Sequence, residues 1–265
     1  MTDTVAPAMR RIALCADDFG LTIGANAAIL ELANAGALSA TSVAVDGPVL
    51  EADVGSLRGL RDRISVGLHL NFTENSRFSD IHGIPGWILA TWLRRIDRLR
   101  LEQEIHRQLD RFETLFGGAP THVDGHEHVH QFPGIREPLL NAVASRYGPA
   151  TVVRCTLPRT WRGPKAAVIG LLGGQALERG IARRGLRCNR DFAGVYDLAT
   201  DSGFHSRMDA WLANIRDGGL IMCHPESGER NASPARRHEY EFLRSAEWPL
   251  LLKNRNVELS RPDRT

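Results

Sequence analysis

Residues 122–130 concentrate side chains that can bind a metal ion. The segment reads HVDGHEHVH and contains His122, Asp124, His126, Glu127, His128 and His130. Histidine is the commonest protein ligand of metal ions, and mixed His, Asp and Glu clusters are typical of metal sites. In an extended segment, alternation would turn the four histidines and Asp124 to one side. One ion cannot bind five such groups, so some would support the ligands or contact a substrate. The alternative is a solvated loop without a ligand.

Asp17 and Asp18 form a second candidate site. They follow the apolar run 11–16, which resembles a buried strand, and they precede Gly20. Two adjacent carboxylates repel each other unless a cation lies between them or one is protonated. Both can reach one site only where the chain is already turning, which Gly20 permits. The alternative is a capping pair for the following helix, because Asp is favoured at helix N-termini.

Two more histidines stand at the ends of apolar runs. His69 follows the run 64–68, and His224 follows the run 220–223. A lone histidine in such a place is more often a hydrogen-bonded structural residue than a ligand. Taken together, however, four separate apolar runs end in residues suited to metal or proton chemistry. The carboxyl ends of parallel strands meet in one active site in α/β folds, and we expect these groups to converge there.

The order of the predicted elements supports that arrangement. Strands are predicted over 11–16, 40–45, 64–68, 151–155 and 220–223, with another beginning near 120, and helices over about 23–35 and 101–116. Alternation of strands and helices favours a parallel sheet over a sandwich. We therefore predict an α/β barrel with a single domain over residues 1–265. The polar ends, residues 1–9 and about 256–265, are candidates for disorder.

Composition excludes several classes of protein. The net charge of +2, without any run of five basic residues, argues against binding to nucleic acid. The longest apolar stretch, 166–177, is well short of the roughly 20 residues that span a bilayer. Residues 1–10 lack the apolar segment of a secretory signal, and the four cysteines include no Cys-x-x-Cys pair. These features predict reduced thiols and a cytoplasmic location.

Four segments together resemble the signature blocks of the YdjC-like carbohydrate deacetylases. They read ADDFG at 16–20, GLHL at 67–70, THVDGHEHVH at 121–130 and MCHP at 222–225, in the family's order. The family includes chitooligosaccharide deacetylases and a branch linked to hopanoid biosynthesis. The resemblance implies a distorted (β/α) TIM-like barrel. It also implies metal-assisted removal of an N-acetyl group from an amino sugar, chitooligosaccharide or related glycoconjugate. A homodimer is an expectation taken from the family.

The resemblance also implies roles for individual residues. Asp18, His69 and His126 would hold one divalent ion, Asp17 would be the general base, and a positively charged His224 would be the general acid. One carboxylate and two imidazoles leave coordination positions open, as a catalytic site requires. Imidazoles suit zinc, whereas a hard, water-rich site suits magnesium, so the donors alone leave the ion open. Members of the family have been described with magnesium and related deacetylases with zinc, so the resemblance makes these two ions nearly equal candidates. The remaining candidates for ligand support or substrate contact are His122, Asp124, His128 and His130.

Three residues near the proposed metal ligands need separate mention: two that differ from the family's usual sequence, and one arginine. The family usually has Ser and His where this chain has Gly125 and Glu127. Neither change replaces a proposed metal ligand, but Glu127 puts in doubt whether the substrate contacts near the metal match those of the best-known members. Arg154 lies in an apolar run, and a buried arginine needs a carboxylate or anion partner. It is a candidate for orienting Asp17, or equally for a structural ion pair.

Two other functions fit the same residues. A phosphoesterase on a His/Asp-rich barrel would use the spare histidines for a two-metal site, so the number of bound ions separates it from a deacetylase. A non-catalytic sugar- or metal-binding protein would tolerate Asp17→Asn. Three tryptophans are candidates for a wall that stacks on a sugar ring, or simply for the core: Trp87, Trp92 and Trp161.

Overall fold

One parallel sheet forms the centre of the protein. A computed structural model describes residues 8–74, 76–198, 203–228 and 233–264. The strands follow the order β5-β4-β3-β2-β1-β7-β6, and β8 pairs with the start of β1. Their bounds are β1 (Arg10–Phe19), β2 (Ala40–Val43), β3 (Ser65–Leu70), β4 (His122–Gly125), β5 (Val152–Val153), β6 (Phe192–Ala193), β7 (Gly219–Cys223) and β8 (Val257–Leu259). Every pairing among them is parallel, as predicted.

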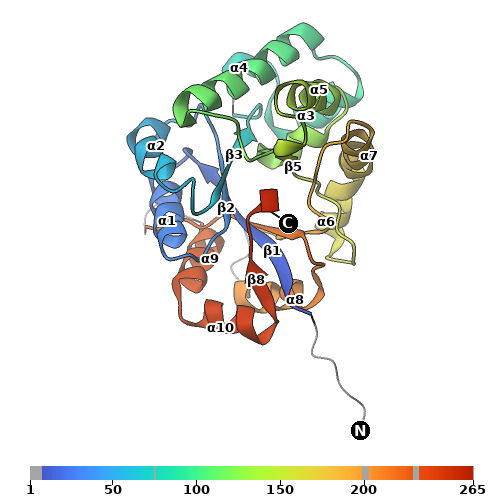
Figure 1. Ribbon diagram of the computed structural model, residues 1–265. Helices are drawn as coiled ribbons and strands as arrows, with labels where there is room; N and C mark the ends of the chain where they lie inside the picture. Colours follow the sequence, from blue (N-terminus) through green and yellow to red (C-terminus); the bar gives the residue numbers. More distant parts are fainter. Residues whose placement is uncertain (1–7, 75, 199–202, 229–232, 265) are drawn as a thin grey trace.

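Helices connect the strands and surround the sheet (Figure 1). Their bounds are α1 (Ile23–Asn34), α2 (Leu50–Arg58), α3 (Gly83–Trp92), α4 (Arg98–Phe116), α5 (Arg136–Arg146), α6 (Pro164–Ile169), α7 (Gln175–Arg183), α8 (Phe204–Asn214), α9 (Pro234–Arg244) and α10 (Glu247–Asn254). Parallel neighbours require such crossovers, because a tight turn can join only antiparallel strands. In the part of the chain described, no helix is both long and apolar enough to cross a membrane.

Helix α4 shows how the sequence determines these elements. Its predicted apolar face is buried, with Ile105 and Phe112 fully inaccessible to solvent. Asp97 caps the first turn by accepting a hydrogen bond from the backbone N–H of Leu99 at 2.9 Å. Gly117 ends the helix in the left-handed region, with φ of 72°. The prediction of a helix over 101–116 is confirmed, and the cap extends it by one turn.

The sheet curls until its two ends approach each other. Val152 in β5 forms a parallel bridge with Arg187, which lies shortly before β6. The side chain of Asn189 then bonds both the N–H and the C=O of Cys155, at 2.8 Å each. A side-chain amide therefore continues the ladder between the two ends. The result is a distorted (β/α) barrel, as predicted.

Two expectations about local structure are wrong. The histidine-rich segment is not extended, because β4 ends at Gly125 and His126–Gln131 forms a 3₁₀ turn. Leu70, the last residue of β3, pairs with Gly125, so the neighbouring strand offers no further ladder. The chain end is not disordered over 256–264, since β8 lies there and pairs with the first residues of β1. Residues 1–7 of the expected N-terminal disorder lie outside the described residues.

Candidate active site

Four strands deliver their carboxyl ends to one cavity. It has a volume of about 560 Å³, and its lining includes Asp17, Asp18, His69, His126 and His224. The first two belong to β1, His69 to β3, and the other two follow directly on β4 and β7. Groups more than 200 residues apart in the chain therefore share one site. Strand-end geometry predicts this convergence in parallel α/β folds.

A bulge in β1 allows both adjacent carboxylates to face the cavity. The register of β1 against β2 shifts between Ala16 and Phe19. Asp18 has φ of 72°, in the left-handed region that L-residues rarely adopt. In a regular strand the two side chains would point to opposite faces. The chain therefore begins to turn at Asp18, and Gly20, with φ of 101°, continues the turn as expected.

Asp18, His69 and His126 bring three donor atoms together. The Asp18 Oδ1 atom lies 3.3 Å from Nε2 of His69 and 3.0 Å from Nδ1 of His126. The two imidazole nitrogens are 3.3 Å apart. Asp18 and His69 are buried and His126 is partly exposed. A carboxylate with two imidazoles is a donor set that divalent transition metals and zinc accept.

Asp124 stands behind His69 and orients its ring. The Oδ1 atom of Asp124 lies 2.6 Å from Nδ1 of His69, which turns Nε2 toward the other two donors. Burial alone would lower the pKa of His69, but the carboxylates of Asp124 and Asp18 outweigh it and raise the pKa to about 10. A carboxylate behind a ligating imidazole is a frequent supporting element of metal sites.

Arg154 holds the second carboxylate of the pair. Its guanidinium bonds both oxygens of Asp17, at 2.5 and 2.6 Å, and reaches Oδ2 of Asp124 at 2.6 Å. The hydroxyl of Ser42 lies 3.0 Å from Asp17 and 2.7 Å from Asp124. Burial raises the pKa of Asp17, but Arg154 outweighs it, so the net shift is downward. Both alternatives for Arg154 fit this geometry, because Arg154 forms a buried ion pair with Asp17 and the same two bonds fix the direction of the Asp17 carboxylate.

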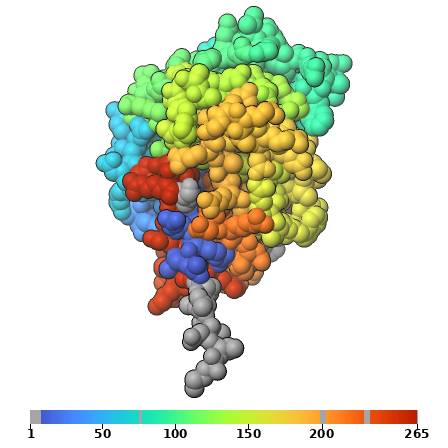
Figure 2. All heavy atoms as spheres, turned by 45° about the vertical axis from the view of Figure 1, so that its right-hand side comes forward, coloured from blue at the N-terminus to red at the C-terminus, as the bar shows by residue number. Residues whose placement is uncertain are grey.

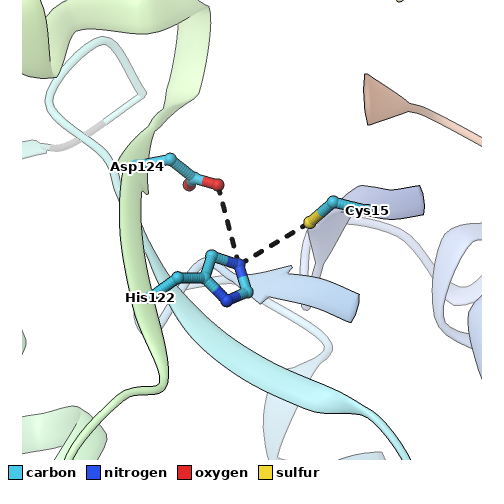
Figure 3. A group of neighbouring side chains, drawn as sticks. All are labelled: Cys15, His122 and Asp124. Atoms are coloured by element: carbon cyan, nitrogen blue, oxygen red, sulfur yellow. Dashed lines mark hydrogen bonds and ion pairs between the residues drawn. The ribbon is translucent and has the colours of Figure 1, made fainter. Parts of the chain in front are cut away.

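Below this layer, a second group of donors lies on the floor of the barrel, and we call Cys15, His122 and Asp124 the floor cluster (Figure 3). Nε2 of His122 is 3.6 Å from Sγ of Cys15 and 3.9 Å from Oδ2 of Asp124. All three are at most 1% exposed. The Asp124 oxygen that faces His122 already interacts with Ser42 and Arg154. A cation there would meet the guanidinium, so we interpret the floor cluster as packing.

Gly67 makes room for this buried imidazole. A Cβ atom at Gly67 would lie 2.5 Å from Cε1 of the His122 ring, far inside van der Waals contact. Burial lowers the pKa of His122 to about 4, so the ring is neutral near pH 7. The glycine in the GLHL block therefore serves the packing of the floor, and His122 supports the site from below without lining the cavity.

His224 also lines the cavity. Its backbone N–H donates to Oε2 of Glu239 in α9, whose Oε1 accepts a hydrogen bond from Tyr196 at 2.6 Å. Nδ1 of His224 is buried without a hydrogen-bond partner among the described residues. Burial lowers the pKa of His224 to about 4 and raises that of Glu239 to about 7. Burial therefore favours the neutral form of the His224 imidazole.

Helix α9 supplies two site residues that the sequence reasoning missed. Arg236 bonds Oδ2 of Asp18 at 2.7 Å, and Glu239, fully buried, supports the backbone of His224. They lie three residues apart, so one face of the helix carries both. The sequence signal that could have drawn attention to them is Glu239, a carboxylate on the apolar face of an amphipathic helix.

The other predicted candidates are divided between the cavity and its walls. His128 lines the cavity, and Glu127 beside it adopts a left-handed conformation with φ of 52°. His130 is buried, and its Nε2 lies 3.0 Å from the carbonyl oxygen of Arg154. Of the tryptophans, Trp87 packs against Phe72 and Phe78 in the core, which is the second of the two alternatives for this residue. Two remain exposed, namely Trp92 and Trp161.

Comparisons with known proteins identify relatives of this chain. The chain is 30% identical to a human carbohydrate deacetylase over 249 residues, which cover 81% of this chain and 74% of the relative. It is also 30% identical to a chitooligosaccharide deacetylase of Klebsiella pneumoniae over 224 residues, 81% of each protein. Among solved structures, a protein of Enterococcus faecalis V583, provisionally assigned to cellobiose-phosphate cleavage, superposes with a TM-score of 0.69. That match covers 97% of this chain and 99% of the other at 19% identity, and it supports the fold alone.

The sequence model of one family matches nearly the whole chain. It is described as YdjC-like protein, and it matches residues 11–254, a range that contains every site residue discussed above. The family predicted from the four sequence blocks is therefore confirmed. The chain belongs to the YdjC-like family of proteins.

Proposed function

We propose that this protein is a metal-dependent hydrolase that removes the N-acetyl group from an amino sugar, as a free sugar, a chitooligosaccharide or a related glycoconjugate. One observation carries the proposal. Three donor atoms of Asp18, His69 and His126 converge within 3.3 Å of one another at a cavity that Asp17 and His224 also line. The names of the two deacetylases that share 30% of its sequence support the reaction and the substrate class.

The chemistry of the donors fits one divalent ion. Asp18, His69 and His126 offer a carboxylate and two imidazoles, and Arg236 and Asp124 fix the first two in place. Two other donor groups among the described residues share Asp124, whose Oδ2 already meets Arg154. One ion therefore fits better than the pair that a phosphoesterase would use. A bound magnesium or zinc ion would polarise the acetyl carbonyl and lower the pKa of water at the site.

Asp17 would serve as the general base. It lines the cavity next to Asp18, and Arg154 with Ser42 keeps its carboxylate ionised and fixed in direction. An oriented carboxylate accepts a proton from water without rearranging, which is the advantage of a preorganised site. General base catalysis of this kind contributes typically 10² to 10⁴ in rate.

His224 would serve as the general acid that protonates the departing amine. Because its pKa lies near 4, the resting ring is neutral and must gain its proton during the reaction. The proton that Asp17 accepts from water would pass to the His224 ring, which would give it to the amine nitrogen as the C–N bond breaks. An imidazolium with a depressed pKa is also a stronger acid than an exposed one, which helps a poor leaving group. Glu239 would fix the backbone at His224, so the ring keeps its place at the cavity wall.

A cytoplasmic location is consistent with the cysteines. All four thiols are free, and three of them are buried. Reduced cysteines are the ordinary state in a cytoplasm, where disulfides rarely persist.

The test is release of acetate by purified protein after removal of metal and addition of magnesium, zinc, cobalt or manganese. Di-N-acetylchitobiose is the first substrate, and Asp17→Asn and His122→Gln are compared with the wild type. We expect acetate only with added metal, loss of activity in Asp17→Asn with metal binding intact, and one ion per chain in all three proteins. Two ions per chain, or full activity in Asp17→Asn, would refute the proposal.

A further inference from the structure

Left-handed backbone at residues other than glycine is concentrated at the cavity. Five such residues lie in the described chain, with φ between 51° and 72°: Asp18, Arg94, Glu127, His128 and Asn256. Three of them, Asp18, Glu127 and His128, line the cavity. A Cβ atom makes this conformation unfavourable, whereas glycine adopts it without strain. Strain of this kind persists where a side chain is needed, as the donor oxygen of Asp18 is, so it points to a role for Glu127 and His128.

The His128 imidazole is buried at the cavity and forms no hydrogen bond with the rest of the described chain. It is 8% exposed, and its Nδ1 atom is sealed from solvent without a partner. Packing holds the ring, which lies edge-on to Phe192 with the centroids 5.8 Å apart. An N–H group at Nδ1 would be a buried donor without an acceptor, so the proton belongs on Nε2. Because His128 lines the cavity, Nε2 is the donor that remains for a ligand.

Glu127 adds a carboxylate to the same cavity. Its side chain is exposed and has no hydrogen bond or ion pair with another described residue. The other carboxylates of the lining are engaged, Asp17 by Arg154 and Asp18 by Arg236. The family usually has a histidine at position 127, so this acceptor distinguishes the chain. A ligand in the cavity therefore meets one free acceptor and one free donor from adjacent residues.

Sugar hydroxyl groups match this combination, because each hydroxyl both donates and accepts hydrogen bonds. A small number of fixed polar groups is what orients a ligand in a binding cavity. Glu127 and His128 take no part in holding the ion or in the proton transfers proposed for Asp17 and His224. They are therefore available to bind the sugar ring.

We propose that Glu127 and His128 form a hydroxyl-binding pair, which recognises the ring of the amino sugar while its acetamido group lies at the ligand group, namely Asp18, His69 and His126. Nε2 of His128 donates to a hydroxyl oxygen of the ring, and the Glu127 carboxylate accepts from a hydroxyl group. The inference rests on the proposed deacetylase function and adds the residues that select the sugar. It restricts the substrate to amino sugars in which the recognised hydroxyl groups are unsubstituted.

The test removes the hydroxyl groups of the sugar one at a time. The ligands are methyl N-acetyl-β-D-glucosaminide and its 3-deoxy, 4-deoxy and 6-deoxy analogues. Calorimetry measures their affinities for Asp17→Asn protein loaded with zinc or magnesium, which is expected to bind them without turnover. Acetate release by the wild type gives kcat/KM for the same four sugars. We expect at least one analogue to lose about threefold to tenfold in affinity and in kcat/KM, because a site that bonds a hydroxyl group discriminates against its absence.

Asparagine substitutions separate the side chains from the backbone, since asparagine tolerates the left-handed region. His128→Asn and Glu127→Asn, each made in the Asp17→Asn protein, should bind the parent sugar about threefold to tenfold more weakly and no longer distinguish it from a sensitive analogue. Arg94→Asn is the matched control, because Arg94 has φ of 53° and does not line the cavity, and it should keep the full discrimination. All three should retain one ion per chain and a melting temperature within about 4 °C of the Asp17→Asn protein.

The outcomes distinguish this inference from the proposed function. Equal affinities for all four sugars, or no binding of the parent sugar, would overturn the inference, and a variant that keeps the whole discrimination would exclude its residue from the pair. Loss of the ion in His128→Asn would assign His128 to metal support, and a melting temperature lowered by more than about 8 °C would assign it to the fold. Position-specific losses of affinity in a protein that releases no acetate would instead refute the deacetylase function and leave the hydroxyl-binding pair in place.

Discussion

The floor cluster and the ligand group at the cavity contain nearly the same residue types but differ in what surrounds them. Each joins imidazole to carboxylate within 4 Å. In the floor cluster, Arg154 supplies the positive charge and the donors are sealed from solvent. In the ligand group, Asp18 and His126 face a cavity. Residue types alone therefore do not make a metal site. In the floor cluster both oxygens of Asp124 are engaged by His69, Ser42 and Arg154. In the ligand group Arg236 bonds only Oδ2 of Asp18, so Oδ1 remains beside the two imidazoles.

The largest expected effect comes from removing a ligand. Asp18→Asn should abolish binding of the ion and reduce acetate release on the order of 10⁴-fold, because several kcal/mol of transition-state stabilisation depend on the metal. His122→Gln, the matched change in the floor cluster, should leave the number of bound ions unchanged. Metal content and acetate release measured on both variants test the contrast, and loss of the ion in His122→Gln would reverse it.

Removing the guanidinium should affect stability most. Arg154→Met would leave Asp17 and Asp124 as buried carboxylates without their countercharge. Breaking a buried pair from one side typically costs about 3–5 kcal/mol. Urea denaturation of the metal-free protein should show a loss of this size. A loss below about 1 kcal/mol would mean that the charge in the floor is dispensable.

Glu239 is a buried carboxyl whose oxygens accept bonds from neutral donors, so it should make stability depend on pH. Burial raises its pKa from 4.5 to about 7 in the folded protein. Its favourable contribution is complete below pH 4.5 and is lost as the pH rises through 7. The free energy of unfolding of the wild type, relative to Glu239→Gln, should therefore fall by at most about 3 kcal/mol between pH 5 and 8. Denaturation curves at several pH values test this, and a constant difference would contradict it.

The smallest effect concerns the packing of the floor. Gly67→Ala should destabilise the protein by about 1–3 kcal/mol, because the new methyl group meets the His122 ring. Adding His122→Ala should recover part of that loss, since the methyl group then enters the space that the ring leaves. A double-mutant cycle measures this coupling. Additive losses would show that the ring and the glycine do not share one space.

The fold and the set of strand-end residues were predictable from the sequence. Apolar runs separated by helical stretches identify a parallel sheet, and such a sheet places Asp18, His69 and His224 at one end. Which residues of 122–130 line the cavity and which are buried behind it was not predictable from the alternation of side chains along a strand. It depends on where β3 stops, since the chain leaves the sheet once Leu70 has no further partner to offer.

Contacts between side chains that are distant in the sequence could also not be predicted from local sequence patterns. Arg236 reaches Asp18 across 218 positions, and Glu239 reaches His224 from a helix with an ordinary amphipathic pattern. The left-handed backbone at Asp18 leaves no compositional sign, because it occurs at an Asp and not at a Gly. These features follow from the closed packing of the barrel and not from local propensity.

The pairing of β8 with β1 has a consequence for biosynthesis. The start of β1 lies beside the last strand, and the blue and red segments meet at the surface in Figure 2. β1 leaves the ribosome before β7 and β8, which follow only after some 200 residues, or about 10–40 s of translation. Until then its apolar edge is open to pairing with other nascent chains. The first strand of this barrel is therefore the segment that a holding chaperone has most reason to cover.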